Sequence, residues 1–311
     1  MRKSKSKVII FIAIIFSVII LVSAILYVVN KPQRIIGNKI AVIPIKGTIS
    51  TENGDGDFFS GGTIGSGMLV DFIEKADRDN SVKAIILNIN SPGGTVVASK
   101  EIADAVKKTN KPVVSYIREV GASGAYWIAS ASDIIVADPL SITGSIGVLG
   151  SYLEFSELFS KYGVKYQNIK TGEFKDLGSP YKELTNEERE VLMSKLRIIH
   201  EHFVDSVSEN RGFDVNELSN GVFYLGIEAK EKWLVDVLGG KQEAIDAAKN
   251  LAGIESYELI FYQKERSVFD ILNKLINNFG YSVGEGFGEK VLAKEDFKIT
   301  LWLLFLFSGY A

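Results

Sequence analysis

The chain has 311 residues, of which 46% are hydrophobic and 23% charged, and it contains no cysteine. This size and composition suit one large or two modest globular cores and exclude a disordered chain. The lack of cysteine excludes disulfides, thiolate metal sites and a cysteine nucleophile, but leaves the redox compartment open. Residues 1–34 hold six basic and no acidic residues, so the remainder carries 29 basic against 38 acidic residues. Such an acidic body is a poor partner for nucleic acid.

Residues 8–29 form an uncharged apolar run of 22 residues. At about 1.5 Å per residue this run can cross a hydrocarbon core of roughly 30 Å, which predicts a transmembrane helix. Four basic residues lie in 1–7 and only Lys31 and Arg34 follow closely, so we expect a cytoplasmic N-terminus and an extracytoplasmic body at the cell membrane. A cleaved secretory signal is the alternative. It fits less well, because the run exceeds the usual apolar core and Tyr27–Asn30 lacks a small-x-small cleavage pattern.

A polar linker at 30–38 leads into a folded domain that we expect over 39–298, beginning with a strand at 40–45. Residues 51–67 are rich in Gly, Asp and Ser, which predicts a long loop, either a lid or a plain surface segment. The tail at 299–311 begins with the apolar run Ile299–Phe307, which is too short to cross a bilayer as a helix. A core or edge strand, a subunit contact and a shallow membrane contact are all open, and we favour burial in protein.

Between these limits, strand and helix patterns alternate. Short apolar runs predict strands, and amphipathic spacing predicts helices, of which 185–210 has a Thr N-cap followed by Glu188. The expected strands lie at 84–89, 112–117, 134–137 and 257–262, and the expected helices at 68–76, 95–108, 122–131, 185–210, 229–238 and 243–251. This alternation predicts an α/β domain with largely parallel strands.

We expect a nucleophilic hydrolase built on this chain to use a serine activated by a lysine, because cysteine is absent and His200 and His202 are the two imidazoles. These histidines lie two apart on an expected helix and point in different directions, unlike an i,i+4 metal pair, so we interpret them as structural. Ser123 lies between Gly121 and Gly124 at the start of an expected helix. There the backbone can approach a substrate, and the helix dipole favours an oxyanion. A helix N-cap serine is the alternative interpretation.

The segment Ser91–Gly94 follows a buried strand and precedes a helix, and its two glycines can expose N–H groups to a substrate. It is the natural second donor of an oxyanion hole. The segment lacks the Gly-rich motif of a phosphate-binding loop. An ordinary strand-to-helix turn is the remaining interpretation.

Lys175 is the candidate base. A lysine accepts a proton only when neutral, so its pKa must fall by roughly 3 units from 10.4 for work near neutral pH. Burial in an apolar pocket would supply that change, whereas a solvated loop lysine is the alternative. Asp176 would oppose the change if it lay close.

Four ordered segments together resemble the signal peptide peptidase A family: Leu87–Ile102, Lys111–Ser130, Ser141–Val148 and Gly172–Pro180. The resemblance covers most of residues 40–250. It implies the Clp protease/crotonase type of fold, with stacked strand-strand-helix units. Ala125 and Thr171 depart from the residues that the family often has, without touching the implied roles.

The resemblance also implies the site. Ser123 would be the nucleophile, Lys175 its general base, and Ser145 the hydroxyl that holds the lysine. The backbone N–H groups of Gly94 and Gly124 would form the oxyanion hole. The implied activity is endopeptidase cleavage of remnant signal peptides at the membrane through an acyl-enzyme, with no metal, nucleotide or other cofactor. Family members form ring or dome homo-oligomers, commonly octamers, in which neighbours complete the site.

Three other functions stay open at this point. A membrane-anchored Ser-Lys protease of the stomatin-operon type would share the anchor and the Pro-Gly-Gly turn. A crotonase-like acyl-CoA enzyme would share the oxyanion geometry but rarely has an N-terminal anchor. A non-catalytic membrane scaffold is the binding-protein alternative.

Overall fold

The computed structural model describes residues 17, 18, 20, 21, 37–54 and 62–263. Residues 17, 18, 20 and 21 are helical, and the rest of the apolar run expected to cross the membrane lies outside the described residues. The tail at 299–311 also lies outside them. Within the described parts of the chain, no helix combines the length and the apolar character that a membrane span requires.

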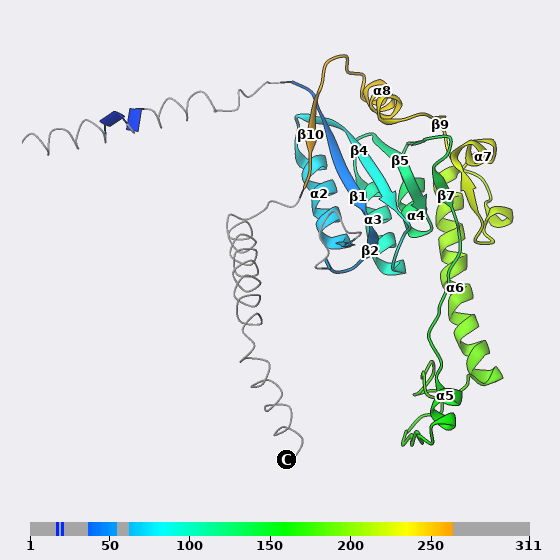
Figure 1. The fold of residues 1–311 in the computed structure, drawn as a ribbon. Helices are drawn as coiled ribbons and strands as arrows, with labels where there is room; N and C mark the ends of the chain where they lie inside the picture. The colour runs from blue at the N-terminus through cyan, green and yellow to red at the C-terminus, as the bar shows by residue number, and fades with distance from the viewer. Residues whose placement is uncertain (1–16, 19, 22–36, 55–61, 264–311) are drawn as a thin grey trace, which may run out of the picture. The chain divides into compact units, whose positions relative to one another are not determined.

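The chain adopts a mixed α/β fold built around one large sheet (Figure 1). Its main strand order is β10-β1-β4-β5-β6-β9, all parallel, and β7 pairs in parallel with β5 and antiparallel with β8. The strands are β1 Lys39–Lys46, β4 Val82–Ser91, β5 Val113–Ala122, β6 Ile134–Ala137, β7 Ile142–Gly144, β8 Phe223–Leu225, β9 Val237–Leu238 and β10 Glu258–Phe261. The predicted α/β class with largely parallel strands is confirmed.

The central strands are apolar on both faces because helices cover both. Alternate residues such as Ile40, Ile86 and Val114 pack with Ala244 and Ile245 of helix α8, Lys241–Ala252. The residues between them, such as Ile85, are also fully buried and face the other layer. That layer consists of α2 Ser66–Arg78, α3 Val96–Lys108 and α4 Gly124–Ser130.

A second, two-stranded sheet lies next to the start of helix α3. Its strands are β2 Thr48–Ser50 and β3 Thr63–Gly65, paired in parallel. Ile49 of β2 also forms an isolated bridge with Gly94, so this small sheet braces the Ser91–Gly94 turn. The expected loop over 51–67 therefore contains a strand and the first residues of α2, and residues 55–61 lie outside the described part.

Helix α6, Asn186–Arg211, is the longest described helix. It begins with the predicted capping box of Thr185 and Glu188 and ends at Gly212, whose φ is +73°. Its C-terminal half packs on the fold through Phe203, Val204 and Val207. A segment that we call the arm, residues 149–184, lies by its N-terminal half and includes α5, Ser156–Lys161 (Figure 1).

The prediction of one helix over 229–238 is wrong. Helix α7, Gly226–Glu231, ends after six residues, and Trp233 has a φ of +60°. The chain reverses there so that Leu234 and Val235 become buried, and Val237–Leu238 then joins the sheet as β9. A segment with amphipathic helical spacing thus contains the end of a short helix, a buried turn and an edge strand.

Candidate active site

Ser123 occupies a strained turn between the end of β5 and the start of α4. Its φ and ψ are +53° and −126°, which an L residue adopts only when its surroundings hold it there. The Ser123 amide donates to the carbonyl of Gly144 at 2.8 Å, and the Ser123 carbonyl accepts from the amide of Trp127 at 3.0 Å. The Ser123 side chain makes no capping hydrogen bond to α4, so an N-cap role does not explain this serine.

Glycines let the turn and the neighbouring segment approach each other closely. A Cβ on Gly124 would lie 2.2 Å from Oγ of Ser99, and one on Gly93 would lie 2.7 Å from the Gly124 amide nitrogen. Gly93 also has a φ of +101°, which disfavours any side chain. The Ser91–Gly94 turn and the Ser123 turn are therefore packed backbone against backbone.

The amide of Gly94 is oriented by the bridge to β2. Ile49 donates to the Gly93 carbonyl at 2.9 Å and accepts from the Thr95 amide at 2.8 Å, so its bonds go to the residues on either side of Gly94. In a parallel bridge of this kind the N–H of the middle residue points away from its partner. The Gly124 N–H is the first of α4 and has no acceptor within the helix. Both N–H groups thus remain available near Ser123, as expected of oxyanion donors.

A cavity of about 610 Å³ opens beside Ser123. Four of the five expected site residues line it, namely Ser123, Ser145, Gly94 and Gly124. The other lining residues come from the Ser91–Gly94 turn, α3, α4, α6 and two further loops: Pro92, Val96, Ser99, Trp127, Gly147, Val148, Leu149, His200, Phe203, Ser219, Asn220 and Gly221. The cavity mixes apolar and hydrogen-bonding groups, which suits a peptide.

Ser145 follows β7 directly and also has a positive φ, +52°. Its amide donates to the carbonyl of Val222 at 3.0 Å and its Oγ donates to the carbonyl of Gly221 at 3.3 Å. The second of these bonds is long, so the hydroxyl can exchange it for another partner in the cavity.

Three cavity residues escaped the sequence analysis or received another role there. Trp127 stacks on Phe203 with ring centroids 4.6 Å apart, and its Nε1 donates to Oγ of Ser206 at 2.8 Å. His200 lies with Nε2 2.7 Å from the Ser219 carbonyl, which ties α6 to the loop beyond it. The sequence spacing could have indicated these residues, because side chains three or four positions apart lie on one face of a helix. Trp127 lies one helical turn after Ser123, and Phe203 lies three residues after His200.

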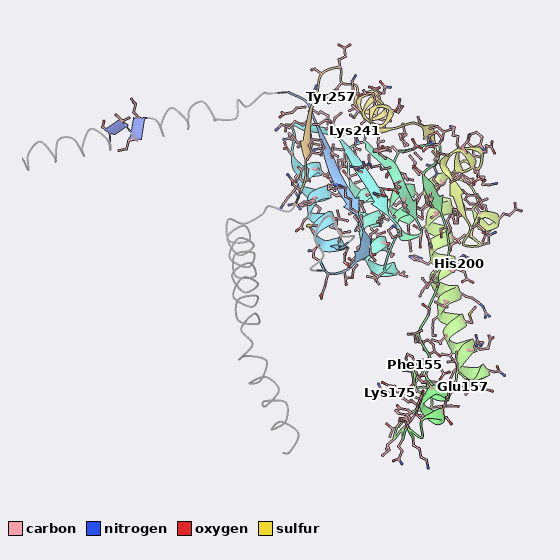
Figure 2. The ribbon with its side chains drawn as sticks, in the orientation of Figure 1. Phe155, Glu157, Lys175, His200, Lys241 and Tyr257 are labelled. Atoms are coloured by element: carbon pink, nitrogen blue, oxygen red, sulfur yellow. The ribbon has the colours of Figure 1, made fainter. Side chains whose placement is uncertain are left out.

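Lys175 lies away from this cavity. It belongs to the arm, its side chain is exposed, and Figure 2 shows it beside Phe155 and Glu157 at the N-terminal end of α6, whereas His200 lies much further along that helix. It lines a separate depression of about 570 Å³ formed by arm residues. Within the described residues, no ion pair or side-chain hydrogen bond involves the Lys175 ammonium group. A single chain therefore does not bring Lys175 to Ser123.

No group of three or more His, Asp or Glu side chains among the described residues could hold a metal ion. The arrangement that is present is a serine on a strained strand-to-helix turn, with free backbone N–H groups and an open cavity beside it. A nucleophilic serine hydrolase requires these features around its serine, together with a general base that the described chain does not place there.

Comparison with known proteins identifies the class further. The model of peptidase family S49 matches residues 105–255, which include Ser123 and Lys175, and the model of Clp protease matches residues 65–136. A Methanocaldococcus jannaschii protein with the provisional name of a protease is 33% identical over 83% of this chain and 85% of its own length. A protein of Enterococcus faecium, provisionally named signal peptide peptidase SppA, is 33% identical over 74% of this chain and 69% of its own length.

Protease 4 of Haemophilus influenzae is 34% identical over 72% of this chain, and this chain spans 37% of that longer protein. A solved structure of a membrane-bound stomatin-specific protease covers 74% of this chain with a TM-score of 0.47 and 16% identity. The chain belongs to the signal peptide peptidase A family, peptidase family S49, and is a serine-type peptidase.

Proposed function

We propose that the protein is a membrane-anchored endopeptidase in which Ser123 is the nucleophile and Lys175 the general base. The observation that carries this proposal is the strained turn at Ser123. The Ser123 hydroxyl makes no capping hydrogen bond, and the residue lines a cavity together with Gly94 and Gly124. Strain of this kind costs about 1–3 kcal/mol and is usually kept where function needs it.

In the proposed reaction, Oγ of Ser123 attacks the peptide carbonyl carbon and its proton passes to neutral Nζ of Lys175. The negative charge that forms on the carbonyl oxygen is stabilised by the N–H groups of Gly94 and Gly124. The C–N bond then breaks, and the Lys175 ammonium returns the proton to the leaving amine. Water, deprotonated by the same lysine, hydrolyses the acyl-enzyme, and Ser145 orients the lysine through its hydroxyl.

Lys175 reaches Ser123 from a neighbouring copy of the chain in this proposal. The arm that carries Lys175 exposes large apolar residues, including Leu149, Leu153 and Ile169, of which Ile169 is 99% exposed. Large apolar side chains that gather exposed on one segment often mark a protein interface. Packing the arm on a second copy would bury these residues and deliver Lys175, so the homo-oligomer, an octamer by family resemblance, would complete each site.

We further propose that the substrates are cleaved signal peptides and other membrane-associated peptides. Such peptides are apolar, and the cavity offers them Val96, Trp127 and Phe203 alongside the backbone donors. The uncharged run at 8–29 would keep the peptidase domain close to these peptides on the extracytoplasmic side. The proposed chemistry requires no metal and no nucleotide.

The proposal is tested by exposing the full-length protein in detergent to a serine-directed acylating peptide analogue, followed by intact-mass measurement. We expect one adduct per chain, located on Ser123 by peptide mapping, and no adduct in the Ser123→Ala variant. Lys175→Ala should slow adduct formation strongly while the oligomer persists. Wild-type protein that assembles but forms no adduct would overturn the assignment and favour a scaffold or an acyl-CoA enzyme.

A further inference from the structure

The turn that carries Lys175 is held by charged groups on both sides. Nζ of Lys170 donates to the Glu173 carbonyl at 2.7 Å and to the Asp176 carboxylate at 2.5 Å, so it bridges the residues before and after Phe174-Lys175. Nδ2 of Asn168 donates to the other Asp176 oxygen at 2.7 Å.

The same carboxylate connects the turn to helix α6. Lys182 lies with Nζ 3.3 Å from Asp176 Oδ2 and also forms an ion pair with Glu188. Glu188 in turn accepts from the Thr185 amide at 3.1 Å as part of the capping box. A continuous series of bonds thus runs from the Lys175 turn to the first turn of α6.

These groups are well shielded from water for an arm that is otherwise exposed. The Asp176 side chain is 10% exposed and that of Glu188 is 5% exposed. Hydrogen bonding from Lys170, helped by Lys182, lowers the pKa of Asp176 to about 2, so the carboxylate stays charged near neutral pH. Charge-assisted bonds of this kind hold geometry better than neutral ones.

We propose that Asp176, through its bonds to Lys170 and Lys182, is the positioning residue that presents Lys175 for catalysis. Its carboxylate is occupied by two other lysines, and none of its described bonds involves the Lys175 ammonium group. From the sequence we expect Asp176 to oppose a neutral base only if its carboxylate lies close to the Lys175 amine. In the structure it instead shapes the turn and leaves the Lys175 amine unpaired. This inference rests on the proposed role of Lys175 as general base.

The ion pair between Lys170 and Asp176 also affects the electrostatic environment of the Lys175 amine. The charged groups in and next to it are Lys170, Glu173, Asp176 and Lys182, with Glu188 behind Lys182. Loss of Asp176 leaves an uncompensated cation near Lys175, which favours the neutral amine. Loss of Lys170 leaves an excess carboxylate, which favours the ammonium form.

The test compares Asp176→Ala, Lys170→Met and the double variant in the full-length assembled protein, with kcat/KM measured against pH on a fluorogenic peptide. We expect each single variant to lose about 10- to 100-fold in kcat/KM, the range that a misplaced catalytic group produces. The acidic limb of the profile should move to lower pH in Asp176→Ala and to higher pH in Lys170→Met. In the double variant, the midpoint of the acidic limb should return toward the wild-type pH. Its kcat/KM should stay low but should not fall below that of the worse single variant, because both residues act through one bond.

Asp104→Asn is the matched control, since Asp104 forms a 2.6 Å ion pair with Lys100 on the exposed side of α3. It should keep wild-type activity. Near-normal rate and pH profile in Asp176→Ala, with Lys175→Ala inactive, would overturn the positioning role and leave the proposed function standing. Normal turnover in Lys175→Ala would overturn both. A melting curve for each variant separates a loosened turn from an unfolded chain.

Discussion

The amide of Ser123 donates a hydrogen bond to the carbonyl of Gly144 at 2.8 Å. This bond continues the pairing of β5 with β7, in which Gly121 lies opposite Thr143 and Ala122 opposite Gly144. The two residues that follow these strands, Ser123 and Ser145, are therefore fixed in register with each other. Both have a positive φ, and both line the cavity. The sheet itself thus places the proposed nucleophile beside the proposed lysine-orienting hydroxyl.

Gly94→Ala should remove one oxyanion donor. A Cβ at this position would lie 1.9 Å from the carbonyl oxygen of Ile49, so the turn and its N–H must move. We expect kcat/KM to fall by about 100- to 1000-fold, as for the loss of one donor elsewhere. Gly67→Ala is the control, because a Cβ there has open space in α2, and its rate and melting temperature should not fall. An active, stable Gly94→Ala protein would contradict the donor assignment.

Ser145→Ala should lower activity without changing the fold. The Ser145 hydroxyl makes only a 3.3 Å bond to the Gly221 carbonyl, whereas its backbone bond to Val222 does not depend on the side chain. We expect a loss of about 10- to 100-fold in kcat from misorientation of the base, with little change in melting temperature. Steady-state kinetics and thermal melting on one preparation check both parts. Equal kcat in the variant and wild type would exclude the orienting role.

Tyr126→Phe should lower stability and spare catalysis. The Tyr126 side chain is fully buried in α4, and its hydroxyl donates to the Leu234 carbonyl at 2.9 Å. Burial raises the pKa of this phenol, so it stays a neutral donor. Removing it leaves a buried carbonyl without its partner, at a cost of about 1–3 kcal/mol in denaturant unfolding. Tyr162→Phe, at an exposed position, should change stability by less than about 0.5 kcal/mol.

The Lys175 turn should loosen in acid. The folded-state pKa of Asp176 is lowered from 3.8 to about 2, so the stabilisation is fully present above about pH 3.8 and is lost as the pH falls through 2. Amide hydrogen exchange should show protection of residues 172–179 declining across this window, relative to α3. In the Asp176→Asn variant, the protection of these residues should already be lower at pH 3.8 and should not change between pH 3.8 and 2. The same pH profile in both proteins would argue against the role of the carboxylate.

The sequence predicted the central fold because periodicity there is strong. The apolar run at 84–89 lies inside β4, and the expected helices at 95–108 and 185–210 match α3 and α6 to within a residue or two. Strands such as β7 and β8 were missed, because three residues carry no periodic signal and their pairing depends on distant partners. The end of α7 at Glu231 and the left-handed turn at Trp233 were also missed, because the positive φ of Trp233 serves tertiary packing of Leu234.

The candidate site was predictable in part for a related reason. Ser123, Gly94 and Gly124 occupy turns next to buried strands, where local sequence restricts geometry. The place of Lys175 was not predictable from local sequence, since it depends on how α6 and the arm extend from the sheet. The pairing of Asp176 with Lys170 and Lys182 likewise follows from the path of the arm, which the local sequence does not determine.

The central claim is that Ser123 of one chain works with Lys175 of another. The most direct test mixes Ser123→Ala and Lys175→Ala chains, each inactive alone, under conditions that exchange subunits, with native mass spectrometry to verify mixed assemblies. The account predicts that peptidase activity returns, to about a quarter of wild type at equal mixing, because half of the chains keep the serine and half of their neighbours keep the lysine. Mixed assemblies that stay inactive would contradict it.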